Sequence, residues 1–323
     1  MPSRTSVWAA AARAIGAREP DLRVRNPDWM AEKLLGPEEL ALLGDHPLVA
    51  ALAKPYAEAV QNPEMLGGAR ILIARTRFID DRFTAALDAG ITQVLILGAG
   101  FDSRAYRFAD RLHSARVFEV DQPDTQQAKM RRVTNAVGEL PRHVTYLPVD
   151  FRHDDFGDAL ARAGYQSDRK TFAIWEGVTM YLPGDAVRDV LRWYAGHAAP
   201  GSTIVFDYTY ASLIQMLQNV DVAKLDEKQK QGLARFRRLT AGEPWLFGLP
   251  DKGEAEFLRG LGIELRSTMG MNSAEAIERY LTREDGTIFG SFPSTDQQGY
   301  LILEAVVGGA LPKNARQDGR TGK

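Results

Sequence analysis

The pattern of apolar and polar residues changes near residue 91. From there on, short apolar runs alternate with segments in which apolar residues recur at helical spacing. The runs lie at 92–97, 116–120, 144–149, 172–175 and 203–206, with two later ones near 263–268 and 300–307. Strands that alternate with helices are typical of βαβ units, so we predict an α/β fold built on a parallel sheet.

Residues 1–90 are expected to be helical. Gly36-Pro37-Glu38-Glu39 is typical of a helix start, with proline at the first position and carboxylates in the first turn. An apolar stripe between Ile71 and Leu87 predicts a longer helix. The predicted organisation is a helical segment at 1–90, a core at 91–307 with a polar helical insert at 208–250, and a disordered tail at 308–323.

Composition narrows the classes of function. Of the 323 residues, 45% are hydrophobic. The chain has 40 Lys and Arg and 42 Asp and Glu, which gives a net charge of −2. A chain without a basic surplus is not expected to bind nucleic-acid phosphates non-specifically. The chain has no cysteine, which excludes disulfides, thiolate metal sites and a cysteine nucleophile. No run approaches 18 apolar residues, and the start does not resemble a signal peptide. We therefore expect a cytoplasmic protein with no metal and no membrane or nucleic-acid partner.

A glycine-rich turn follows the first predicted strand. Gly98-Ala99-Gly100 allows the backbone to approach a ligand closely at the carboxyl end of that strand. Asp121 ends the second strand and is placed to accept hydrogen bonds from the two hydroxyls of a ribose. Ser103 stands at the third position of the dinucleotide fingerprint, which disfavours NAD. The alternative is a tight turn followed by a helix cap.

Two more acidic residues end predicted strands. Asp150 and Phe151 follow the third strand, where a carboxylate and a backbone N–H group suit an adenine edge. Glu176, beside Gly177, follows the fourth strand and is placed to hold an ammonium group. Helix capping is the alternative role for each carboxylate.

Arg75 is unusual because it falls within the apolar stripe of its predicted helix, whereas Arg77 points to the opposite face. A buried guanidinium requires an anion, which is either a structural carboxylate or the carboxylate of a ligand. A ligand with adenine, ribose, ammonium and carboxylate groups is S-adenosylmethionine. An NAD-dependent dehydrogenase is the alternative, although NAD has no amino-acid end.

With these residues in place, the chain resembles the leucine carboxyl methyltransferase family of class I S-adenosylmethionine-dependent methyltransferases, in its bacterial small-molecule and polyketide O-methyltransferase branch. The similar stretches are Arg75-Thr76-Arg77-Phe78-Ile79-Asp80-Asp81, Leu97-Gly98-Ala99-Gly100-Phe101-Asp102-Ser103-Arg104, Phe118-Glu119-Val120-Asp121-Gln122-Pro123, Val149-Asp150-Phe151-Arg152, Glu176-Gly177-Val178-Thr179-Met180-Tyr181-Leu182 and Gly242-Glu243-Pro244-Trp245. The resemblance implies a Rossmann-like fold with a seven-stranded, mostly parallel sheet, a helical N-terminal lid and a helical insert after the fifth strand.

The resemblance also implies roles for individual residues. The donor's carboxylate is expected on Arg75 or Arg77, its methionine portion on Gly98, its ribose on Asp121, its adenine on Asp150 and Phe151, and its amino group near Glu176. The full expected donor-binding set is Arg75, Arg77, Gly98, Gly100, Asp121, Gln122, Asp150, Phe151, Glu176 and Gly177. A basic residue near the N-terminus is also implied, and both Arg4 and Arg13 qualify.

The predicted reaction is methylation of a carboxylate on a small molecule or peptide natural product, which yields a methyl ester and S-adenosyl-L-homocysteine. A carboxylate is ionised at pH 7 and needs no general base, and no histidine stands out as one. Arg75, Tyr181 and Tyr208 are expected to orient the reactants. Methylation of a phenol or other hydroxyl, with His153 or a tyrosine as activator, is the alternative. Aromatic residues of the insert that we expect against either a planar acceptor or the core are Tyr208, Tyr210, Phe236, Trp245 and Phe247.

Overall fold

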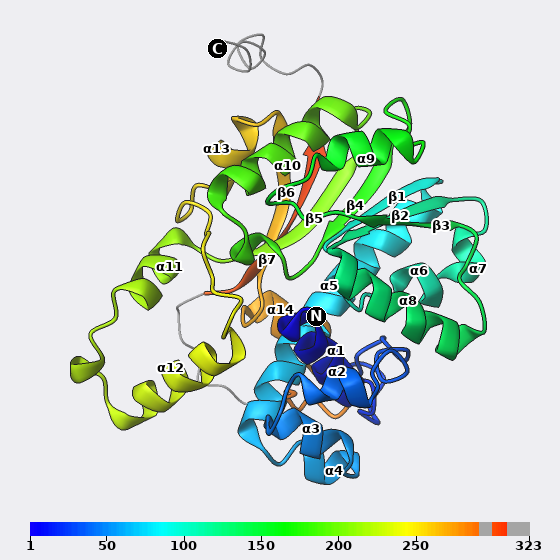
Figure 1. The fold of residues 1–323 in the computed structure, drawn as a ribbon. Helices are drawn as coiled ribbons and strands as arrows, with labels where there is room; N and C mark the ends of the chain where they lie inside the picture. Colours follow the sequence, from blue (N-terminus) through cyan, green and yellow to red (C-terminus); the bar gives the residue numbers. More distant parts are fainter. Residues whose placement is uncertain (291–298, 309–323) are drawn as a thin grey trace.

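A seven-stranded sheet forms the centre of the protein in the computed structural model, which describes residues 1–290 and 299–308 (Figure 1). The strand order is β3-β2-β1-β4-β5-β7-β6, and β7 alone runs antiparallel to its neighbours β5 and β6. The strands are β1 (Gln93–Leu97), β2 (Arg116–Asp121), β3 (Val144–Pro148), β4 (Thr171–Trp175), β5 (Thr203–Tyr208), β6 (Ile263–Gly270) and β7 (Leu301–Val307). The predicted α/β class and mostly parallel sheet are thus confirmed.

Helices cover both faces of this sheet (Figure 1). The helices are α1 (Arg4–Gly16), α2 (Pro37–Ala41), α3 (Pro47–Leu52), α4 (Tyr56–Ala59), α5 (Pro63–Asp88), α6 (Arg104–Arg107), α7 (Ala109–Leu112), α8 (Pro123–Val137), α9 (Phe156–Arg162), α10 (Gly184–His197), α11 (Ala211–Gln218), α12 (Glu227–Leu239), α13 (Glu254–Arg259) and α14 (Ala274–Tyr280), with short 3-10 helices η1 (Thr179–Tyr181) and η2 (Val222–Lys224).

The central strands have continuous apolar sequences because helices pack against both of their faces. In β1, Val94 and Ile96 pack into a core shared with α1, α5, α8 and α14, whereas Leu95 and Leu97 pack into a core shared with α9, α10 and α13. Successive side chains of a strand point to opposite faces, so one strand supplies both cores. The strand order reverses between β1 and β4, which is where open α/β sheets bind ligands.

The helical N-terminal segment packs against the sheet through α5. The 26-residue α5 includes the predicted apolar stripe, and α1 lies along it. The helix expected after Gly36 begins at Pro37, with the Gly36 N–H donating to the Glu39 carboxylate at 3.0 Å. The insert between β5 and β6 carries α11 and α12, as its polar helical pattern predicted. The predicted disordered tail lies outside the described residues, apart from Gly308.

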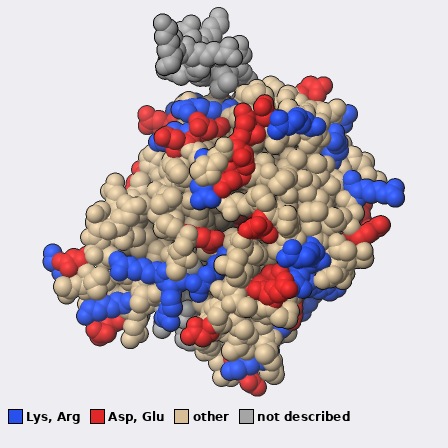
Figure 2. All heavy atoms as spheres, in the orientation of Figure 1, with Lys and Arg blue, Asp and Glu red and all other residues tan. Residues whose placement is uncertain are grey.

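No described helix combines the length and apolar character needed to cross a membrane. Acidic and basic side chains are both spread over the face shown in Figure 2, in keeping with the near-zero net charge.

A buried ion pair joins the sheet to α8. Lys129 of α8 lies with its Nζ atom 2.8 Å from the Glu119 Oε2 atom of β2, and both side chains are almost fully buried. The Tyr106 hydroxyl donates to the same carboxylate at 3.1 Å. Burial raises the pKa of Glu119, which makes its partner Lys129 important for keeping the group charged.

We expect Lys129→Met to lower the free energy of unfolding by about 3–5 kcal/mol, because it leaves a buried carboxylate without its cation. The double variant Lys129→Met/Glu119→Gln removes both charges and should recover part of that loss. Urea unfolding of the three proteins measures both effects. Equal losses in the single and double variants would show that the charge of Glu119 is not the cause.

Candidate functional site

A cavity of about 580 Å³ opens at the carboxyl ends of β1 to β4, a volume typical of small-molecule sites. Gly98, Asp121, Asp150 and Glu176 line it, each from the end of a different strand. Residues of α1 and of the insert line the same cavity from the other side. The parallel strands therefore bring together residues that are far apart in the sequence.

The glycine turn forms one wall of the cavity. Gly98 has a φ angle of +62°, and a Cβ atom built there would overlap the side chain of Val178. Gly100 also has a positive φ angle, and its N–H donates to the Oδ2 atom of Asp121. Glycine is needed at both positions for conformation and, at Gly98, for space.

Asp121 lies at the end of β2 with its carboxylate held by backbone groups. Besides the bond from Gly100, its Oδ1 atom accepts the N–H of Gln122 at 2.6 Å. Burial raises the pKa of Asp121 to about 6, so its carboxylate is ionised at pH 7 and becomes protonated in mild acid. No described cation forms an ion pair with this carboxylate, which leaves its charge available to a ligand.

Arg75 is buried, as the apolar stripe predicted, and it is paired with carboxylates of the protein itself. Its Nε atom lies 2.7 Å from the Oε1 atom of Glu176, and its Nη1 atom donates to Asp207 at 2.8 Å and to the Tyr300 hydroxyl at 2.6 Å. The structural ion pair considered above is therefore present. Among the described residues, however, the Nη2 atom has no hydrogen-bond acceptor, and Arg75 also lines the cavity.

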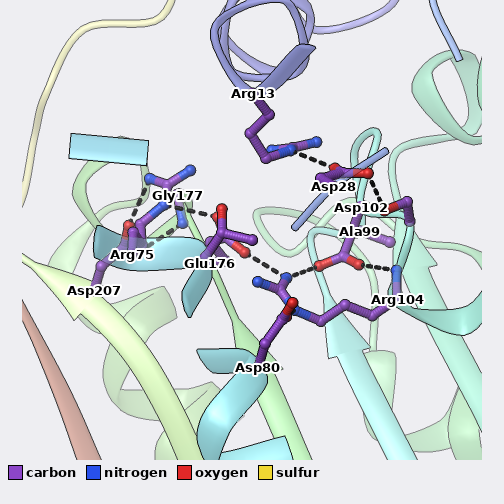
Figure 3. Close-up of polar contacts among 12 residues, drawn as sticks. Arg13, Asp28, Arg75, Asp80, Ala99, Asp102, Arg104, Glu176, Gly177 and Asp207 are labelled. Carbon is purple, nitrogen blue, oxygen red and sulfur yellow. Dashed lines mark hydrogen bonds and ion pairs between the residues drawn. The ribbon is translucent and has the colours of Figure 1, made fainter. Parts of the chain in front are cut away.

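Glu176 lies between two guanidinium groups (Figure 3). Arg75 holds its Oε1 atom and Arg104 of α6 holds Oε2 at 2.6 Å. Burial alone would raise the pKa of Glu176, but these two cations outweigh it and hold that pKa well below its usual range. Glu176 is thus a permanently ionised acceptor at the cavity wall.

Arg13 of α1 reaches the same cavity. Its Nε atom donates to Asp28 at 2.8 Å (Figure 3). Its Nη2 atom donates to the Phe101 carbonyl at 2.7 Å, and Arg13 lines the cavity. Arg4, the other arginine considered for an N-terminal role, does not line the cavity. The structure therefore brings Arg13, and not Arg4, to the candidate site.

The remaining predicted residues at the strand ends also line the cavity. Asp150 accepts two hydrogen bonds from the Arg152 guanidinium, which lowers the pKa of the Asp150 carboxyl group. The half-buried Phe151 ring packs against Trp175. The further predicted residues found in the lining are Gly100, Gln122, Gly177 and Tyr181.

Two predicted site residues lie elsewhere, so we withdraw both from the candidate site. Arg77 donates to the backbone carbonyls of Arg25 and Leu22, because two residues along a helix turn it away from the face of Arg75. Tyr208 donates to Glu254 at 2.7 Å, since alternation along β5 points it away from the face of Asp207. His153, the predicted activator of a hydroxyl acceptor, is exposed and does not line the cavity.

Some contributing residues were not predicted. Asp207 is fully buried and accepts the N–H of Gly177 at 2.6 Å as well as the bond from Arg75. A carboxylate directly after the apolar run 203–206 was the available signal. Tyr300 and Glu243 also line the cavity. Tyr300 begins the predicted strand 300–307 and Glu243 lies in the family-like stretch 242–245, but neither pattern indicates that the side chain reaches the site.

Aromatic rings form the end of the cavity nearest β5 and β7. The Trp245 ring is stacked on Tyr300 at 6.1 Å and meets Phe236 edge-on at 5.0 Å and Tyr181 edge-on at 6.4 Å. All four residues line the cavity. The other aromatic residues expected of the insert pack into the fold: Tyr208 and Tyr210 on Glu254, and Phe247 on Phe257.

The chain is similar in sequence to a known protein family and to several curated proteins. The family model described as leucine carboxyl methyltransferase matches residues 6–195. A protein of Frankia alni, provisionally named an S-adenosyl-L-methionine-dependent methyltransferase, is 37% identical over 205 residues, covering 61% of this chain and 67% of the relative. A similarly named Bacillus subtilis protein is 32% identical over 221 residues, covering 65% and 72%. A solved Thermobifida fusca structure, provisionally named a methyltransferase, covers 91% of this chain and 97% of its own at 18% identity and a TM-score of 0.46.

The crowding at Gly98 gives a test of the glycine turn. We expect Gly98→Ala to lower the free energy of unfolding by about 1–3 kcal/mol more than Gly138→Ala, because the added methyl group meets Val178. Gly138 is a matched control, with a positive φ angle but no atom within 4 Å of a built Cβ atom. Chemical unfolding of both variants measures the difference. Equal losses would mean that backbone conformation alone requires glycine at residue 98.

Proposed function

The chain belongs to the leucine carboxyl methyltransferase family and uses S-adenosyl-L-methionine, and on that premise we propose that it methylates a carboxylate of a small molecule or peptide natural product. The observation that carries the proposal is the chemistry of the cavity wall. Among the described residues that line it there is no histidine, and three of its carboxylates, Asp102, Asp150 and Glu176, are paired with arginines. Such a site suits an acceptor that is already ionised.

The described residues fit the methyl donor. Gly98 and Gly100, both with positive φ angles, bring the backbone of the turn to the cavity wall without side chains, and Asp121 offers a carboxylate without an ion-pair partner to the ribose hydroxyls. Asp150 and Phe151 are proposed to contact the adenine, Glu176 the amino group, and the Nη2 atom of Arg75 the carboxylate. When bound, S-adenosylmethionine supplies the sulfonium methyl group that an oxygen nucleophile attacks.

The protein's own contribution is proposed to be orientation and exclusion of water. A carboxylate has a pKa near 4, so a general base adds little to its reactivity at pH 7. Hydration weakens such a nucleophile, and an enclosed apolar cavity removes that hydration. The rings of Tyr181, Trp245 and Tyr300 supply an apolar wall on the acceptor side.

We propose that residues 1–90 act as a lid and that the insert 208–250 closes the cavity with them. The supporting contact is the N–H of Thr5, at the start of α1, which donates to the Glu243 carboxylate at 2.9 Å. Ser3, Ser6 and Trp8 line the cavity from the same segment. A lid in this position would cover both reactants during transfer.

Methylation of a hydroxyl group is the second candidate, and one observation favours it. Glu243 lines the cavity and has no ion-pair partner among the described side chains, so it is available as a base. A carboxylate is nevertheless a weak base towards a phenol of pKa near 10. We therefore place this candidate second.

The nature of the product separates the two candidates. We expect incubation with methyl-labelled donor and a panel of aryl and alkyl carboxylic acids to give labelled products that release methanol in mild base, because methyl esters hydrolyse. Matched phenols and alcohols should remain unlabelled. Label that resists base, obtained with phenols and not with acids, would replace the carboxyl proposal with hydroxyl methylation.

Donor binding should depend on pH through Asp121. Only the ionised carboxylate accepts hydrogen bonds from both ribose hydroxyls, so we expect the dissociation constant of the donor to rise about tenfold per pH unit below the Asp121 pKa of about 6. Above pH 7 the dissociation constant of the donor should not change with pH. Calorimetry on wild type, Asp121→Asn and the exposed control Asp110→Asn tests this expectation. A step of the same size in Asp121→Asn would assign the titration to another group.

A further inference from the structure

The charges that line the cavity do not balance. Each cation is already matched within the protein: Arg13 by Asp28, Arg75 by Glu176 and Asp207, and Arg152 by Asp150. The carboxylates of Asp121 and Glu243 have no ion-pair partner among the described residues. Within the described residues, the cavity therefore presents two carboxylates without an ion-pair partner and no arginine without one.

Glu243 contributes its side chain to the lining of this cavity. It follows α12 in the insert, and its Oε2 atom accepts the Thr5 N–H of α1 at 2.9 Å. Its side chain is close enough to Asp121 for the two charges to repel, which adds to burial in raising the pKa of Asp121. Glu243 also acts electrostatically on Tyr181, at the aromatic end. Its charge therefore acts both on a strand-end residue and on an aromatic residue of the cavity wall.

We propose that Glu243 selects the methyl donor over the spent product by charge. S-adenosylmethionine carries a sulfonium and an ammonium group against one carboxylate, so its net charge is +1. S-adenosylhomocysteine is a thioether with a net charge of zero, because the positive charge of the sulfonium is cancelled when the methyl group leaves. A carboxylate without an ion-pair partner in the wall of the donor's cavity favours the cationic molecule and has much less effect on the neutral one.

This selection has a consequence for turnover. Before transfer, the donor neutralises one of the two surplus charges, and an anionic acceptor then enters a less repulsive cavity. After transfer, the surplus returns and product binding weakens. The inference rests on the use of S-adenosylmethionine and is independent of whether the acceptor is a carboxylate or a hydroxyl.

The variant Glu243→Gln separates charge from structure, because its amide oxygen still accepts the Thr5 N–H. We expect the affinity for S-adenosylmethionine to fall about tenfold in this variant, while the affinity for S-adenosylhomocysteine changes less than about twofold. Glu243→Ala should in addition weaken both ligands, because the contact with α1 is lost. The exposed Glu278→Gln serves as the control for a change in overall charge. Isothermal titration calorimetry gives all of these constants.

Wild-type protein provides a second measurement that needs no variant. Raising the salt concentration should weaken S-adenosylmethionine binding more than S-adenosylhomocysteine binding, and Glu243→Gln should reduce that difference. An equal loss of affinity for both ligands in Glu243→Gln would overturn the proposal. It would mean that the Glu243 carboxylate binds the ammonium group that both ligands share, or that it only supports the structure of the insert. Unchanged affinities with a lower rate at saturating donor would also overturn it and identify Glu243 as the base for a hydroxyl acceptor.

Discussion

The pairing of Glu176 with two buried arginines is the interaction on which the site depends. Arg75 comes from α5, Arg104 from α6 and Glu176 from the end of β4, so three separate elements meet at one carboxylate. Removing charges from water is costly, and the cost is offset only when the partners are held in good geometry. The network therefore fixes the N-terminal helices to the ligand-binding edge of the sheet. Asp207 and Tyr300 extend it to β5 and β7.

The strands and the donor side of the cavity were predictable because both follow from local patterns. A buried strand shows as an apolar run, and the carboxyl ends of parallel strands share one edge, so Gly98, Asp121 and Glu176 were expected together. The burial of Arg75 followed in the same way from its place in an apolar stripe. The partners of Arg75 could not be predicted, because periodicity shows on which face of a helix a side chain lies but not which residues lie opposite that face.

The aromatic side of the cavity was predictable only in part, for a physical reason. Trp245 and Phe236 reach the cavity, whereas Tyr208 is buried in the core and the partly buried Phe247 packs against it, although all four belong to one aromatic insert. Aromatic residues occur both in cores and at binding surfaces, so residue type alone does not decide between the two places. Which place each takes depends on how the insert folds over the sheet, and that depends on contacts with α1 and β7 that lie far away in the chain.

Most residues of the two ends of the cavity come from different parts of the sequence. Residues at the ends of β1 to β4 lie between positions 98 and 177, inside the matched family region, whereas three of the four aromatic residues, Phe236, Trp245 and Tyr300, lie beyond its end at residue 195. Mutation and recombination can therefore act on the aromatic end while the strand ends stay unchanged. With this layout, the specificity for the methyl acceptor can change during evolution while the binding of the methyl donor is kept.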